Sequence, residues 1–189
     1  KNDINELLEH NNLSAFRDTA TGMYNKDGFT REIQNMFKKA KKGESISAVL
    51  IKTRVFSDKN RIDEKGVSVK LDIETSECMK KLSLNNNVVC AKLSDNQFIF
   101  VSVGNHSEDF HEKIADRLHN LIMHSPVYKS AGETANILTS GTTMYSLNTS
   151  LEELMLTLTD KMNRSTKDLS NLQKSQGFTE FNTIRTAMY

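Results

Sequence analysis

A hairpin near the middle of the chain constrains the fold more than any other stretch. Two apolar runs rich in β-branched and aromatic residues, 88–93 and 98–103, flank four polar residues, Ser94 to Gln97. This pattern predicts a strand, a tight turn and a second strand. We expect the hairpin to be central to a sheet, with a tip that projects polar groups where a ligand could sit.

The composition predicts a folded domain and excludes several classes of protein. The 189 residues are 37% hydrophobic and 26% charged, which is typical of a globular domain. A net charge of +1 argues against a nucleic-acid surface. No run of about 18 apolar residues and no signal peptide occurs, so we expect a cytoplasmic protein without a membrane span. Cys78 and Cys90 lack metal-ligand spacing and are predicted to be buried free thiols.

Hydrophobic periodicity predicts the other elements. The expected order is a helix in 1–16, a helix in 26–40, a strand in 46–56, a helix in 67–82, the hairpin, a helix in 110–122, a strand in 135–147, a helix in 151–162 and a weak strand near 178–184. Asn25 is expected to cap the second helix, Thr149 and Ser150 offer overlapping capping boxes for the helix that follows them, and Pro126 is expected to follow a helix stop. This order predicts an α+β fold with a ferredoxin-like antiparallel sheet flanked by helices, preceded by an N-terminal helix.

Residues 18–25 read Asp-Thr-Ala-Thr-Gly-Met-Tyr-Asn, residues 91–98 read Ala-Lys-Leu-Ser-Asp-Asn-Gln-Phe, and residues 159–167 read Thr-Asp-Lys-Met-Asn-Arg-Ser-Thr-Lys. These three segments resemble the GGDEF domain, the catalytic domain of diguanylate cyclases. Residues 18–25 resemble the family's opening segment, usually Asp-x-Leu-Thr-Gly-Leu-x-Asn. Residues 159–167 resemble its late Ala-Asp-x-Ala-x-Tyr-x-Ala-Lys segment, and residues 91–98 fall where the family has Ala-Arg-x-Gly-Gly-Asp/Glu-Glu-Phe. The resemblance implies the βααββαβ order of nucleotide-cyclase and palm domains. It also implies a linker or signalling helix at 1–17, followed by a degenerate GGDEF domain at 18–189.

The resemblance implies a signature without its catalytic groups. The signature position is occupied by Ser94, Asp95, Asn96, Gln97 and Phe98, with amides where the family has acids. In the family, magnesium activates the attacking hydroxyl of GTP and is held by carboxylates. We therefore expect no catalytic residue, no metal site and no cofactor.

Further positions of the family's site are also changed. The metal-binding aspartate falls on Lys52 and its neighbouring acid on Arg54. The family's inhibitory product site, Arg-x-x-Asp, falls on 85–88 and is absent. A lysine in place of a metal ligand adds a repelling charge, worth roughly 4 kcal/mol per unit of cation charge at about 4 Å.

Two family positions are retained. Asn60 matches the residue that reads the guanine base, although its partner falls on Val69. Lys167 matches a lysine that contacts phosphate, although its partner falls on Asn171. Together with Lys52 and Arg54, these residues form a candidate nucleotide- or anion-binding set. The alternative interpretation of Asn60 is a turn residue, and that of Lys167 is an ordinary exposed lysine.

The sequence thus favours a catalytically inactive GGDEF-like domain that serves as a regulatory or protein-interaction module in a bacterial signalling protein. The alternative is a non-catalytic nucleotide or anion sensor that uses the former active-site cleft. Residual phosphohydrolase activity is a third hypothesis. The expected partner is an upstream sensor domain or a partner protein, and a homodimer and a bound nucleotide stay open.

Overall fold

Four strands form one antiparallel sheet. The computed structural model describes residues 15–55, 64–83, 87–131, 135–144 and 149–176. The strands are β1 (Ser45–Val55), β2 (Val88–Ser94), β3 (Gln97–Gly104) and β4 (Ala135–Met144), in the sheet order β2-β3-β1-β4. The predicted α+β class and antiparallel sheet are confirmed. The hairpin is central only through β3, because β2 lies at the sheet edge.

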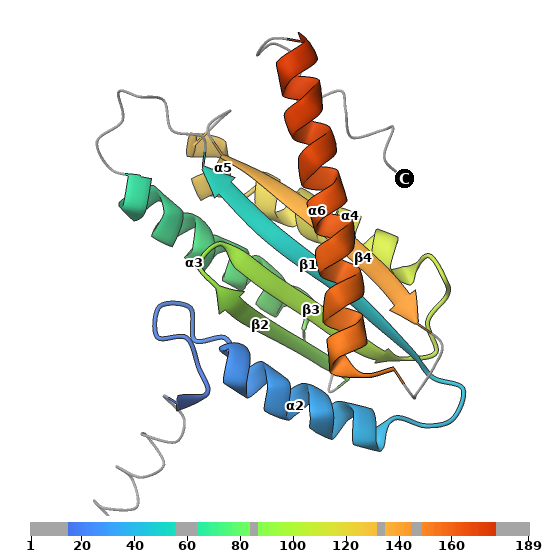
Figure 1. Cartoon of the computed structure of the whole chain (residues 1–189). Coiled ribbons are helices and arrows are strands. Elements are labelled where there is room, and N and C mark those ends of the chain that lie inside the picture. Colours follow the sequence, from blue (N-terminus) through green and yellow to red (C-terminus); the bar gives the residue numbers. More distant parts are fainter. Residues whose placement is uncertain (1–14, 56–63, 84–86, 132–134, 145–148, 177–189) are drawn as a thin grey trace, which may run out of the picture.

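Helices cover both faces of the sheet (Figure 1). Helices α2 (Lys26–Lys39) and α6 (Leu151–Gln176) pack on one face, and α3 (Glu64–Leu82), α4 (Phe110–Met123) and α5 (Pro126–Ala131) pack on the other. Along β1, Leu50 belongs to the core beneath α2 and α6, whereas Val49 and Ile51 belong to the core beneath α3, α4 and α5. Burial on both faces explains why this strand is continuously apolar instead of alternating.

The helix starts follow the predicted capping chemistry. The side chain of Asn25 accepts a hydrogen bond from the backbone N–H of Gly28 at 2.9 Å. The hydroxyl of Ser150 likewise accepts one from the N–H of Glu153 at 3.1 Å. Each cap satisfies a backbone donor that the first helical turn leaves unpaired.

Two elements differ from the sequence-based expectation. Pro126 follows the end of α4 at Met123, as predicted, but it also begins the short helix α5, since a proline at the first helical position loses no helical hydrogen bond. Helix α6 continues to Gln176, beyond the apolar stripe that ends at Met162, because a solvated helical extension needs no apolar face. The expected N-terminal helix, apart from its last residues, and the weak last strand lie outside the described residues.

Cys78 and Cys90 are buried free thiols, as predicted. Burial raises the pKa of the Cys90 thiol to about 12, so this thiol stays protonated at neutral pH. Within the described part of the chain, no helix has the length and apolar character needed to cross a membrane.

Two histidines lie at the end of the sheet where β1 begins. The ring of His106 stacks on Phe110 with ring centroids 4.0 Å apart, and its Nε2 lies 2.9 Å from the hydroxyl of Ser102. His111 packs over Gly141 and places Nδ1 3.0 Å from the hydroxyl of Thr143. Burial lowers the pKa of both rings; nearby Lys161 adds to the effect at His111, while Glu44 opposes it at His106.

We therefore expect the domain to lose stability as the pH falls through about 6.5, the ordinary pKa of histidine. In this range the unfolded chain takes up protons that the folded rings resist, so the free energy of unfolding decreases. Urea unfolding at pH 7.5 and 5.5 measures the difference. The variant H106N/H111N lacks both rings and should show a smaller difference in the free energy of unfolding between the two pH values. A difference equal to that of the wild type would contradict the assignment of this pH dependence to the two histidines.

Candidate functional site at the hairpin tip

The tip between β2 and β3 is a two-residue turn, Asp95-Asn96. Asn96 has φ 63°, in the left-handed region that asparagine tolerates better than most residues. Its side-chain oxygen accepts a hydrogen bond from the hydroxyl of Ser68 on α3 at 2.7 Å. The side-chain oxygen of Asn96 is therefore already hydrogen-bonded to α3.

Lys52 lies beside this tip on the neighbouring strand. The sheet register pairs Lys52 with Gln97 on β3 and with Leu138 on β4. Directly paired residues share a face of the sheet, so the lysine and the glutamine are adjacent. Lys52 is exposed, and no acid among the described residues forms an ion pair with it. This face of the tip thus presents an ammonium and a carboxamide, which do not form the carboxylate set that magnesium requires.

A buried lysine secures the base of the tip from the other face of the sheet. The Nζ of Lys92 lies 3.1 Å from Asp72 of α3, and 3.6 Å from both Asp18 and Asp95. The side chain of Lys92 is only 9% exposed. Burial alone would lower the pKa of Lys92, but the surrounding carboxylates outweigh burial and raise it. Lys92 therefore remains charged, as a cation shared by three acids.

Asp72 connects this lysine to the turn. Its Oδ2 contacts Lys92 and also accepts a long hydrogen bond, 3.4 Å, from the backbone N–H of Asn96. Its Oδ1 accepts a bond from the hydroxyl of Thr53 at 3.4 Å. Burial raises the pKa of Asp72, and the hydrogen bond and charge of Lys92 offset this only in part. Asp72 thus joins α3, β1 and the tip.

The opening segment completes the cluster. Asp18 accepts hydrogen bonds from the N–H and hydroxyl of Thr21, at 2.9 and 2.7 Å. Burial would raise the pKa of Asp18, but the bonds from Thr21 and the charge of Lys92 together lower it. The backbone N–H of Lys92 donates to the carbonyl of Tyr24 at 2.8 Å. The segment that leads into the domain is therefore attached to the hairpin by both charge and backbone.

The other predicted site residues are only partly placed. Arg54 pairs with Asn136 through the backbone near the end of β1, and Asn60 lies outside the described residues. Lys167 is exposed on α6. The structure therefore brings Lys52 to the tip, and it leaves the contribution of Arg54 and Asn60 as a prediction.

The position of Lys167 follows from the contacts between α6 and β4. The hydroxyl of Ser140 donates to the carbonyl of Leu158, and the Nζ of Lys161 donates to the carbonyl of Gly141. Lys167 lies six residues, about 9 Å, further along the helix. Lys167 therefore lies beyond the residues of α6 that these two bonds attach to β4.

The cluster formed by Asp18, Asp72 and Lys92 was not predicted from the sequence. Signals for it were present. Asp72 lies on the buried face of its helix, between Leu71 and Thr75. Lys92 is two residues after Cys90 on β2, so both side chains point to the same face of the sheet. A charged residue on a buried face usually has a charged partner.

The chain has the fold of GGDEF domains. No protein-family model and no curated protein matches it. A sensory box/GGDEF family protein from Caulobacter crescentus CB15 superimposes with a TM-score of 0.65 at 19% identity, covering 81% of this chain and 99% of that one. The coiled coil and GGDEF domain of Caulobacter crescentus DgcB, solved in complex with c-di-GMP, gives a TM-score of 0.70 at 12% identity and 88% coverage of both chains.

A third similar structure contains a partner protein. The diguanylate cyclase SiaD from Pseudomonas aeruginosa, solved with its activator SiaC, has a TM-score of 0.61 at 13% identity. The match covers 88% of this chain and 64% of that one. These likenesses establish the fold, and the chemistry of the site has to be argued from the residues of this chain.

Proposed function

We propose that this chain is a catalytically inactive GGDEF-like domain that acts as a regulatory or protein-interaction module in cyclic di-GMP signalling, in the cytoplasm of a bacterium. The observation that carries the proposal is the pairing of Lys52 with Gln97 at the signature hairpin. A cyclase needs a carboxylate-bound magnesium ion at this edge. An ammonium beside a carboxamide repels that ion and offers it no anionic ligand.

The GGDEF-like fold around a changed tip supports a role in transmitting a signal. We assign residues 1–17 to a linker or signalling helix and residues 18–189 to the domain. Asn25 holds the end of this linker region, since its side-chain N–H donates to the carbonyl of Ala15 and its backbone N–H to that of Phe16. Tyr24 then contacts Lys92 of the hairpin. A movement of an upstream sensor domain or partner protein would thus reach the tip directly.

A nucleotide or anion sensor is the second candidate function. It is favoured by Lys52, an exposed cation beside the hairpin tip, with Lys167, Arg54 and Asn60 as further candidate contacts. A cation without a metal suits a phosphate group bound for recognition instead of reaction.

Thermal-shift measurements against a nucleotide panel separate the two functions. A ligand at about 100 times its Kd stabilises the folded state by about 2.7 kcal/mol and raises the melting temperature. The interaction module predicts no shift with GTP, GDP, ATP or cyclic di-GMP, in the wild type and in K52A alike. A nucleotide-dependent shift that K52A abolishes would instead establish the sensor.

A further inference from the structure

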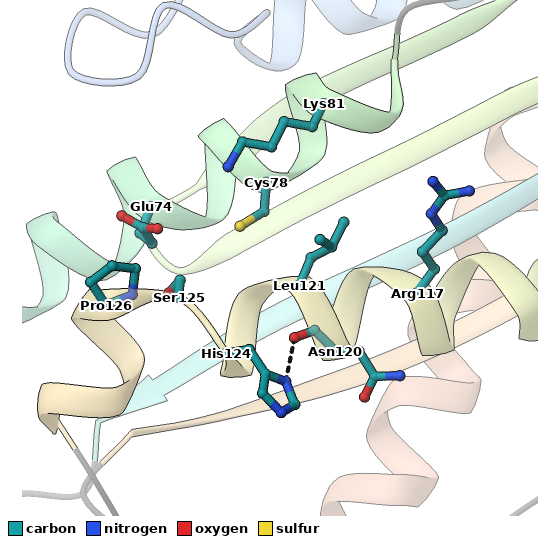
Figure 2. Close-up of a pocket in the computed structure, with 9 residues that line it drawn as sticks. All are labelled: Glu74, Cys78, Lys81, Arg117, Asn120, Leu121, His124, Ser125 and Pro126. Atoms are coloured by element: carbon teal, nitrogen blue, oxygen red, sulfur yellow. Dashed lines mark hydrogen bonds between the residues drawn. The ribbon is translucent and has the colours of Figure 1, made fainter.

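A surface groove lies on the sheet face opposite to Lys52. Figure 2 shows it as a groove between α3 and α4, closed at one end by the start of α5. Its volume is about 660 Å³, within the range of small-molecule sites. No function assigned above uses this groove.

The two walls of the groove each carry a cation. Lys81 comes from α3 and Arg117 from α4, and both side chains are exposed. Neither forms an ion pair with another described residue, whereas neighbouring Lys80 and Lys113 pair with Glu77 and Asp109. Long cationic side chains that are left unpaired on opposite walls of a groove are available to an anionic ligand.

The opposite end of the groove carries an acid. Glu74 lies there beside Pro126 (Figure 2). Two cations against one carboxylate leave a charge of +1, which complements a monoanion better than a polyphosphate. Glu74 and Lys81 are seven residues apart on one helix, so their backbones lie about 10 Å apart, and Figure 2 shows the Lys81 side chain extending back along α3 toward Cys78. Arg117 lies toward the other end of the groove from Glu74, which suits a small organic molecule with a different group at each end.

The floor between these ends is mostly apolar. Cys78 is buried, and Leu121 is half-buried. Ser125 lies at the Glu74 end of the groove beside Pro126 (Figure 2), is only 6% exposed, and its hydroxyl has no hydrogen-bond partner among the described residues. A buried unpaired hydroxyl is uncommon in native structures, and one use for it is a bound molecule.

We propose that this groove binds a small organic monocarboxylate. The carboxylate lies between Lys81 and Arg117, a compact apolar body covers Leu121 and Cys78, and a hydrogen-bond donor at the far end meets Glu74. The site is separate from the face of the hairpin tip that carries Lys52, so the tip can be inactive whether or not this groove is occupied.

The probe for this site is 4-hydroxyphenylacetate, which has a carboxylate, an aromatic body and a terminal donor. Titration followed by amide NMR should give saturable shifts at Cys78, Asn120 and Leu121, with a Kd of about 1 mM or below. The neutral analogue tyrosol, in which a hydroxymethyl group replaces the carboxylate, should bind at least about tenfold more weakly.

Three substitutions test the assignment of the cations. R117Q and K81Q should each weaken binding of the probe by about fivefold, the effect of one partly exposed charge pair. K70Q removes an equal charge from an exposed position of α3 outside the groove and should leave the Kd unchanged. The proposal is wrong if no saturable shift appears by about 10 mM probe, if tyrosol binds equally well, or if R117Q/K81Q binds as the wild type does.

Discussion

Replacing Lys92 with methionine is expected to lower the free energy of unfolding by about 3–5 kcal/mol, because it leaves buried carboxylates without their cation. Asp72 is the main cause, since its side chain is 5% exposed and lies 3.1 Å from the lysine Nζ. Methionine keeps the length and apolar stem of the side chain, so the loss comes from the charge. Urea unfolding at neutral pH, followed by circular dichroism, measures the change.

The double variant K92M/D72L provides the control for this prediction. It removes the uncompensated charge together with the lysine, and we expect it to recover at least half of the stability lost in K92M. The charge-matched K70M, at an exposed position of α3, should change stability by less than about 0.5 kcal/mol. A K92M variant as stable as K70M would show that Lys92 does not hold the cluster together.

Restoring acids at the tip is expected to create a divalent-metal site that the wild type lacks. In K52D/Q97E, two carboxylates face each other across paired positions of β1 and β3. The exchange removes a repelling ammonium and supplies oxygen ligands, and each unit charge at about 4 Å is worth roughly 4 kcal/mol against a monovalent cation. Allowing for solvent exposure, the affinity for Mn²⁺ should rise by at least about 100-fold.

Electron paramagnetic resonance of free Mn²⁺ measures that affinity. The control, K70D/Q34E, makes the same charge changes at exposed positions on two different helices and should not reproduce the gain. If K52D/Q97E binds Mn²⁺ no better than the control, the pairing of Lys52 with Gln97 does not govern the metal chemistry of the tip.

The sequence predicts most of the fold because its local signals are strong and agree. The hairpin, the central strand β1 and the caps at Asn25 and Ser150 all appear where pattern and propensity indicate. The missed elements are those with weak periodicity. Helix α5 is only six residues long, and the last turns of α6 lack an apolar stripe, so neither produces a hydrophobic period to detect.

The candidate site was predictable only where the resemblance assigns its residues. Lys52 and Gln97 were both expected there because the resemblance places them at positions where the family has acids. The pairing of Lys92 with Asp72 and Asp18 depends on how α3 and the opening segment pack against the hairpin. Packing of elements distant in the chain is not encoded in any single local pattern. The groove between α3 and α4 was missed for the same reason.

Direct measurement of cyclic di-GMP synthesis tests the central claim. Micromolar protein is incubated with GTP and either Mg²⁺ or Mn²⁺, beside an active diguanylate cyclase as a positive control, and the product is quantified by mass spectrometry. The pairing of Lys52 with Gln97 predicts no product above the protein-free background with either metal. Product that accumulates with time and protein concentration would contradict the account, and would show that this tip supports cyclisation without the acids.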